Sequence, residues 1–174
     1  TVKIEGLLSL QVQTDGPVRI LLAETRHDGK LRGIARMDEE KDATQGNLLG
    51  TKGQLIITIE PDKGRRYQGI VELEEGGIAK SLEGYFRQSE QLDTHLWINC
   101  ENGVAAGLFL QELPALGEVQ ETMEVDEDAW NRLNQLAQTL RPDELMHLDN
   151  DEILHRLYHE EKVRLYDAQS LTFN

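Results

Sequence analysis

The chain has 174 residues, of which 39% are hydrophobic and 5% aromatic, and its 32 acidic and 18 basic residues give a formal net charge of -14. This composition supports one domain with a core of mainly aliphatic side chains and leaves room for a small appended subdomain. The acidic balance argues against a nucleic-acid-binding protein, because that class needs an excess of Lys and Arg, and against a partner in the anionic membrane surface.

The first two thirds of the chain alternate apolar and polar side chains in short runs, which is typical of β-strands. Asp28 and Gly29 form a strong signal for a two-residue hairpin turn. Gly46, Gly50 and Gly53 lack the spacing of a phosphate-binding loop, so we interpret them as turn residues. The predicted strands are 8–13, 18–23, 31–37, 55–59, 67–73, 94–100 and 104–113.

Helical spacing of apolar residues predicts an amphipathic helix over residues 78–91. In the C-terminal part the pattern is helical again. We expect Asp126 to cap the first helix there, Pro142 to lie in the first turn of a second helix, and Asn150 to cap a third. Residues 163–166 are expected to form a short strand.

These elements predict an α+β fold, with an antiparallel-rich β-sheet of about six strands, one packed helix and a small helical linker subdomain after them. Six strands at about 4.8 Å spacing make a sheet roughly 25–30 Å wide, whereas one helix covers about 10 Å. We therefore expect the C-terminal helices, a segment ahead of Thr1 and a second chain to complete the helical layer.

The charge distribution indicates a domain boundary near Pro114. Residues 1–114 carry 18 acids and 13 bases, whereas residues 115–174 carry 14 acids and 5 bases. This change of composition predicts a β-rich core domain over residues 1–114 and an acidic helical linker region over residues 115–174.

Side chains with catalytic or metal-binding chemistry form no complete set in the sequence. His155 and His159 are four residues apart and are followed by Glu160, which would suit an acidic metal-dependent hydrolase, but the HExxH spacing and a third ligand are missing. We therefore expect the chain not to be an enzyme. Cys100 is the single cysteine, so the chain can form neither an internal disulfide nor a four-cysteine metal site, and we interpret Cys100 as a packing residue.

Four strings resemble the heat shock protein 33 family in identity and order: LRGIAR at 31–36, RYQGIV at 66–71, YFRQSEQL at 85–92 and LYHEE at 157–161. The resemblance covers nearly the whole chain, and the last two strings are its most specific parts. It implies a cytoplasmic holdase chaperone that binds unfolding or oxidatively damaged proteins without ATP and prevents their aggregation.

The resemblance also implies a C-terminal zinc module with four cysteines, in which oxidation forms disulfides, releases zinc and exposes surface for clients. The chain ends at Asn174, about where that module would begin, and a segment ahead of Thr1 is expected to be missing too. We therefore expect zinc only in the full-length protein, no cofactor in this chain, and constitutive activity of this fragment. The resemblance further implies a homodimer with exchanged elements, and ATP-dependent foldase chaperones downstream.

One face of the first C-terminal helix, together with two apolar residues of the second, is the candidate client-binding surface. In the resting state this face is expected to pack on the sheet, and we expect clients to bind it when it is released. A plain assembly adaptor with one folded partner is a second alternative to the holdase, beside the hydrolase. The candidate client-binding residues are Trp130, Leu133, Leu136, Leu140, Leu145 and Met146.

Overall fold

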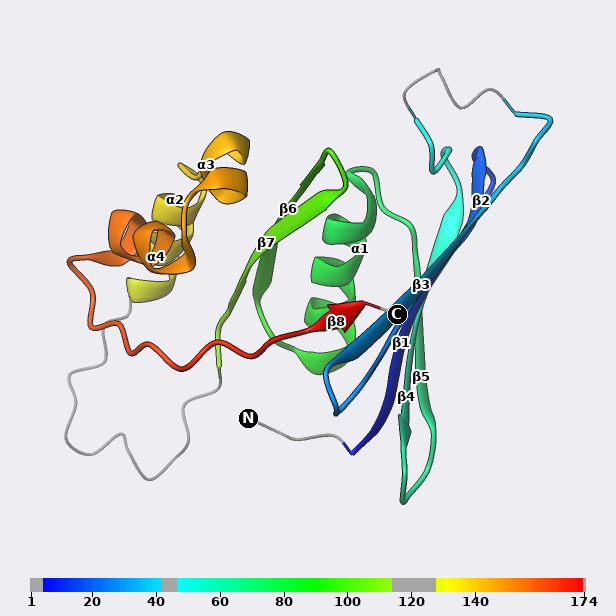
Figure 1. Ribbon diagram of the computed structural model, residues 1–174, viewed down its shortest axis with the longest axis horizontal. Helices are drawn as coiled ribbons and strands as arrows, with labels where there is room; N and C mark the ends of the chain where they lie inside the picture. Colours follow the sequence, from blue (N-terminus) through cyan, green and yellow to red (C-terminus); the bar gives the residue numbers. More distant parts are fainter. Residues whose placement is uncertain (1–4, 42–46, 114–127, 174) are drawn as a thin grey trace. The chain divides into compact units, whose positions relative to one another are not determined.

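Figure 1 shows the computed structural model, which describes residues 5–41, 47–113 and 128–173. The chain divides into two compact units. The sheet unit comprises Thr1–Tyr85 together with Asp167–Asn174, and the hairpin unit comprises Phe86–Tyr166. No helix of the described residues is long and apolar enough to cross a membrane.

The sheet unit contains six strands in the order β5-β4-β1-β2-β3-β8. Neighbouring strands run antiparallel, except that β8 pairs in parallel with the first two residues of β3. The five strands predicted between residues 8 and 73 are confirmed. The strands are β1 (Gly6–Thr14), β2 (Val18–Arg26), β3 (Lys30–Met37), β4 (Gly53–Pro61), β5 (Tyr67–Glu72) and β8 (Thr172–Phe173).

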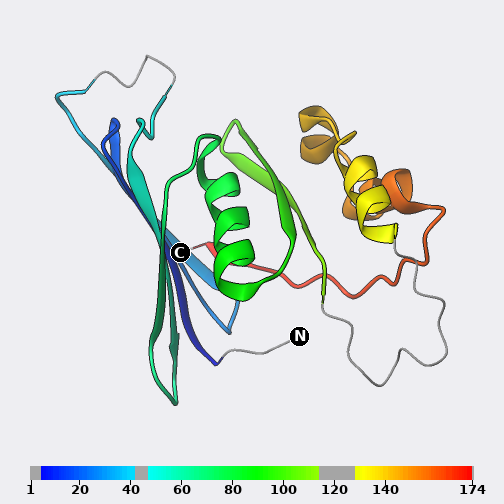
Figure 2. The same cartoon turned by 180° about the vertical axis from the view of Figure 1, so that it is seen from behind.

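The core of the sheet unit lies between the sheet and α1 (Gly77–Tyr85), which covers one face of the sheet in Figure 2. Val12 of β1 lies directly opposite Leu55 of β4, and both side chains are buried. Tyr85 packs over Gly69 of β5 so closely that a Cβ atom on residue 69 would lie 2.6 Å from the tyrosine ring. The missing side chain at residue 69 therefore lets the helix approach the sheet.

Asp15 ties the turn between β1 and β2 to the segment that leads into β4. Its Oδ1 atom accepts hydrogen bonds from the backbone N–H groups of Thr51 at 3.0 Å and Lys52 at 2.9 Å. The hydrogen bond from Lys52 is the main cause that lowers the pKa of Asp15 below its ordinary value. Gly50 has a φ of 70° beside this carboxylate, which confirms it as a turn residue.

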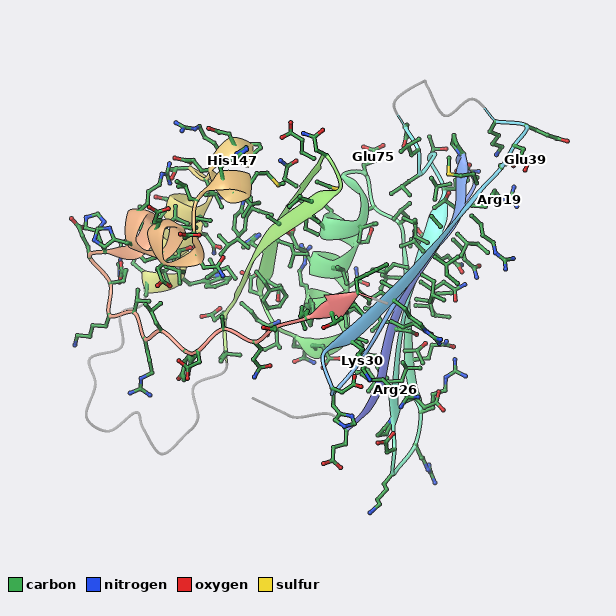
Figure 3. All side chains as sticks on the ribbon, in the orientation of Figure 1. Arg19, Arg26, Lys30, Glu39, Glu75 and His147 are labelled. Atoms are coloured by element: carbon green, nitrogen blue, oxygen red, sulfur yellow. The ribbon has the colours of Figure 1, made fainter. Side chains whose placement is uncertain are left out.

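Exposed ion pairs lie at the two ends of the strands. Figure 3 shows Arg19 at one end of the sheet and Arg26 with Lys30 at the other. Arg19 lies 3.4 Å from Asp38, and Arg26 lies 3.8 Å from Asp62. Exposed pairs of this kind contribute roughly 0–1 kcal/mol each, so the sheet unit depends on its ladders and its core rather than on surface charge.

The hairpin unit begins with a π-helical turn, η1 (Phe86–Glu90), that follows α1 directly in the chain. The two elements together confirm the helix predicted over residues 78–91. The predicted hairpin is confirmed as well, with a turn of two residues in which Asn102 and Gly103 have φ values of 51° and 78°. The remaining elements are β6 (Thr94–Glu101), β7 (Val104–Gln111), α2 (Ala129–Ala137), α3 (Pro142–His147) and α4 (Asn150–Tyr158).

The structure differs from the sequence predictions in the place of the last hairpin. Strands β6 and β7 form a sheet of their own and belong to the same compact unit as α2, α3 and α4. The compact units therefore do not follow the predicted division at residues 114 and 115, because the helices bury their apolar side chains on the hairpin.

Two local predictions need correction, and a third falls on a residue outside the described part of the chain. Residues 163–166 form no strand, because each of these side chains is exposed and no strand of the described chain pairs with them; the short strand β8 follows later. Asp126 lies outside the described residues, and the N-cap position of α2 is Asp128. The N-cap of α4 is Asp149 rather than Asn150, and Pro142 opens α3 as predicted.

Candidate functional site

The apolar side chains of α2, of the turn after it and of α3 lie in the core of the hairpin unit. Leu140 and Leu145 are each only 8% exposed, and the side chains of Leu133 and Leu136 pack against the same cluster. Most of the candidate client-binding residues are therefore brought together, but in a buried arrangement. The cluster consists of Ala137, Leu140, Leu145, Ile153, Leu157 and Tyr158, with Trp97, Ala106, Leu108, Leu110, Leu133, Leu136 and Leu154 packed on it.

The two remaining candidates lie at the rim of this core. Trp130, in the first turn of α2, is half-buried, and its Nε1 atom donates a hydrogen bond of 2.6 Å to Oδ2 of Asp93. Its ring stacks on His95 of β6, with 6.0 Å between the ring centroids and 22° between the planes. Met146 in α3 is half-buried too, and it does not belong to the cluster defined above.

Two charged contacts hold the helices to one another. Arg132 of α2 donates from Nε and Nη2 to the carboxylate of Glu161, at 2.7 and 3.2 Å. Glu144 of α3 is buried, and its Oε1 atom lies 2.7 Å from Nε of Arg156 in α4 and 3.3 Å from Nη2 of Arg141. Charge-assisted contacts of this geometry fix the relative placement of short helices.

Helix α2 also contains a buried polar atom that lowers its stability. The Oδ1 atom of Asn134 is buried and has no hydrogen-bond partner among the described residues. Such an atom costs about 1–3 kcal/mol. On the same helix the carbonyl oxygen of Leu133 accepts a hydrogen bond of 3.4 Å from Tyr158, whose pKa burial raises, so the hydroxyl remains a donor. The helix is thus held by side-chain contacts that are partly offset by an unsatisfied amide.

A second apolar surface crosses the open face of the sheet unit. Side chains alternate between the faces of a strand, so Ile70 points away from α1, which covers its neighbour Gly69. The register aligns residues of five strands in one transverse row, in which Ile34 and Ile70 are 54% and 56% exposed. From one edge to the other the row is Ile70, Ile56, Gln11, Leu22 and Ile34.

The histidine pair does not assemble a metal site. The rings of His155 and His159 stack with centroids 5.5 Å apart, and both residues are exposed. Nε2 of His159 lies 3.9 Å from Oε1 of Glu160. Among the residues that the structure describes, no group of three or more His, Cys, Asp or Glu side chains could hold a metal ion.

The interpretation of Cys100 as a packing residue was wrong, because its side chain is exposed. Cys100 lies opposite Ala105 and next to the closing pair of the hairpin turn, at the end of the two-stranded sheet, where residues 101–105 are exposed too. The apolar alternation of the strand was correctly recognised, but it did not reveal that this end of the hairpin is uncovered.

The sequence prediction missed the polar contacts at the rim of the core, made by Asp93, His95, Glu144 and Arg156. Only Glu144 had a signal that could have been used: it lies three residues after Arg141, and it accepts the backbone N–H of Arg141 at 3.0 Å, as the third residue of a capped helix does. The other contacts join residues far apart in the chain, and no spacing rule predicts them.

Comparison with known proteins adds a consistent result. The model of the family described as "Hsp33 protein" matches residues 1–174. The "33 kDa chaperonin" of Shewanella denitrificans is 46% identical over 99% of this chain and 58% of the relative. That of Pseudomonas aeruginosa is 44% identical over 100% of this chain and 59% of the relative. The chain thus spans a little under 60% of the length of these relatives.

The fold has a solved counterpart. The crystal structure of the 33 kDa chaperonin (heat shock protein 33 homolog) from Thermotoga maritima matches with a TM-score of 0.74, over 98% of this chain and 60% of that one. The sequences are 20% identical in this comparison, so it bears on the fold alone.

Proposed function

The chain belongs to the Hsp33 family, and from this premise we propose that it is the body of a holdase chaperone, which binds unfolding proteins and prevents their aggregation. The observation that carries the proposal is the apolar core of the hairpin unit, which three short helices share with a two-stranded sheet. Local opening of these helices exposes a continuous apolar surface. The net charge of -14 would keep the resulting complex soluble.

The client-binding surface in this proposal is the released face of α2 and α3. It comprises Trp130, Leu133, Leu136, Leu140, Leu145 and Met146. Helices of nine residues or fewer have little stability on their own, so side-chain contacts with the hairpin determine whether they stay folded. The buried, unpaired amide oxygen of Asn134 further favours release of α2. The apolar row on the open face of the sheet offers additional exposed area.

Redox control is proposed for the whole protein. The relatives are longer than this chain, and the family resemblance supports a zinc module with four cysteines beyond Asn174. Zinc-binding energy would be folding energy for such a module, so oxidation of its ligands would unfold it and loosen the adjacent helices. We expect residues 1–174, tested by themselves, to act constitutively.

The proposal includes partners and a compartment. Unfolded clients are the main partners, and the resemblance supports a homodimer with exchanged elements and transfer of clients to ATP-dependent foldase chaperones. The same resemblance supports a cytoplasmic protein.

Light scattering of a heat-denaturing client tests the proposal. We expect the chain to suppress aggregation equally under reducing and oxidising conditions, and Arg132→Ala to suppress it at a lower concentration, because its contact with Glu161 holds α2 closed. Arg19→Ala is the matched control, since it breaks an exposed ion pair in the sheet unit. Absence of suppression by the unmodified chain under both conditions would contradict the proposal, and a saturable one-to-one complex with a single folded protein would favour the adaptor.

A further inference from the structure

A shallow pocket of about 410 Å³ lies beside β7, entirely within the hairpin unit. Residues 105–108 of β7 form one wall, and Leu145 of α3 with Asn150, Ile153 and Leu154 of α4 form the other. Ile153 is buried, whereas Leu154 and Leu108 are half-buried and remain accessible from the pocket. The pocket therefore offers apolar side chains next to the edge of a strand.

The backbone of β7 has hydrogen-bonding groups that face outward beside this pocket. In a hairpin with a two-residue turn, the residues that flank the turn, here Glu101 and Val104, bond to each other, and bonded pairs then recur at every second residue. Ala106 and Leu108 thus bond to β6, and the N–H and C=O groups of Ala105 and Gly107 point away from it. In the described part of the chain, β7 pairs with no strand other than β6.

This edge also lacks the features that usually protect an exposed strand. Natural edges carry Lys, Pro, bulges or covering loops that prevent another strand from pairing. Ala105 and Gly107 are both exposed and have small side chains or none, and the β6–β7 register runs without a bulge. A further strand would meet little steric hindrance here.

We propose that an extended peptide segment pairs with β7 as a third strand and places an apolar side chain in this pocket. Backbone hydrogen bonds to Ala105 and Gly107 would provide affinity, and the pocket lined by Leu145 and Leu154 would select an apolar residue, as in other cases of strand addition. The inference rests on the proposed function only in naming an unfolded chain as the source of the segment.

Charge determines which occupant fits best. Residues 86–166 contain 17 acids and 6 bases. Asp151 and Glu152, which directly follow the pocket residue Asn150, are exposed, and within the described residues neither forms an ion pair with Lys or Arg. A segment that carries Lys or Arg beside its apolar residue complements the acidic first turn of α4, whereas a second copy of the chain would bring the same acidic residues against it.

The test uses fluorescence anisotropy of a short labelled peptide that alternates Val and Lys, titrated with the whole chain. Ala105→Pro removes an outward N–H without breaking a bond to β6, and we expect it to weaken binding about fivefold or more. Cys100→Pro is the matched control, because Cys100 lies opposite Ala105 and its N–H points outward from β6, on the edge away from the pocket. We expect that variant to bind the peptide as the unmodified chain does.

Equal binding by Ala105→Pro and the unmodified chain would overturn the inference, as would a change in oligomeric state alone. Peptides N-methylated on one or the other set of alternate residues provide a second test that does not depend on a variant folding. One set should lose binding and the other retain it, and equal binding of both would count against strand addition. Aggregation suppression measured in parallel separates the two proposals: a chain that suppresses aggregation but fails the peptide test retains the holdase function and loses this site.

Discussion

The sheet unit and the hairpin unit keep their folds in different ways. In the sheet unit, five strands of six to nine residues share backbone ladders, and Leu55 lies fully buried at their centre. In the hairpin unit, three short helices rest through side chains on two strands, and charged contacts close the rim. One chain thus combines a sheet that unfolds only as a whole with helices that can separate from the hairpin when a few contacts break.

The two tryptophans make this comparison measurable. Trp97 and Trp130 are the only tryptophans of the chain, and both lie in the hairpin unit. Their fluorescence therefore reports the opening of that unit, whereas circular dichroism reports the strands of both. The predictions below use this difference, beginning with the largest expected effect.

Leu55→Ala and Leu157→Ala remove the same atoms from two buried sites, one in each unit. Each is expected to cost about 2–5 kcal/mol of stability through lost burial and a cavity. In urea, Leu157→Ala should shift the fluorescence transition and leave most of the circular dichroism transition in place, and it should increase client binding. Leu55→Ala should shift the circular dichroism transition. If Leu157→Ala shifts both signals equally, the units do not open separately.

Glu144→Gln tests the charged contact between α3 and α4. Loss of its pairing with Arg156 and Arg141 should lower the stability of the hairpin unit by about 1.5–3 kcal/mol, because the site is buried. Asp143→Asn is the control, since Asp143 lies in the same helix and pairs with Arg141 at an exposed position. Equal effects of the two substitutions on the fluorescence transition would show that burial of Glu144 is unimportant.

Asn134→Leu is expected to stabilise the hairpin unit. Leucine has nearly the shape of asparagine and removes the unpaired oxygen, so we expect a gain of about 1 kcal/mol. The same change should weaken client binding at a fixed temperature, because α2 is released less often. Gln135→Leu, at an exposed position of the same helix, should have no such effect on the fluorescence transition.

The smallest effect concerns the pH dependence of the sheet unit. Hydrogen bonds from the backbone, led by that of Lys52, lower the pKa of Asp15 below 3.8, so its contribution to stability is present above that value and is lost as the pH falls through the lowered pKa. Asp15→Asn should therefore be less stable than the unmodified chain near neutral pH, and the difference should shrink in acid. Urea midpoints measured from pH 6 to about 2.5 check this. A difference that stays constant over this range would contradict the assignment.

Local patterns were sufficient to predict much of the fold. Alternation at residues 8–13 and the helical period from residue 78 each depend on neighbours in the chain, and the structure confirms them. The turn signal at Asp28 and Gly29 gave the right place but the wrong length, because three residues, 27–29, connect β2 to β3 and of these only Gly29 has a positive φ. The sequence did not predict that the hairpin from Thr94 to Gln111 leaves the main sheet, because strand order is determined by which apolar faces meet. A β-like run at 163–166 was misleading for the same reason, since a strand also needs a partner.

The candidate site was predicted in part. The helical period identified Leu133, Leu136 and Leu140 as one apolar face, but periodicity cannot say what that face packs against or how firmly. The contact of Trp130 with Asp93 and that of Arg132 with Glu161 join residues 37 and 29 positions apart. Such long-range polar contacts depend on the assembled fold, and only the structure reveals them.

Amide hydrogen exchange tests the central claim most directly. It would compare segments of α2, α3 and α4 with segments of β4 at the temperature at which the chain suppresses aggregation. We predict that the helices exchange through local opening much faster than β4, and that a bound client changes exchange in the helices but not in β4. Equal protection of the helices and β4 under these conditions would contradict the account, because the apolar face of α2 would then be no more available to clients than the core of the sheet.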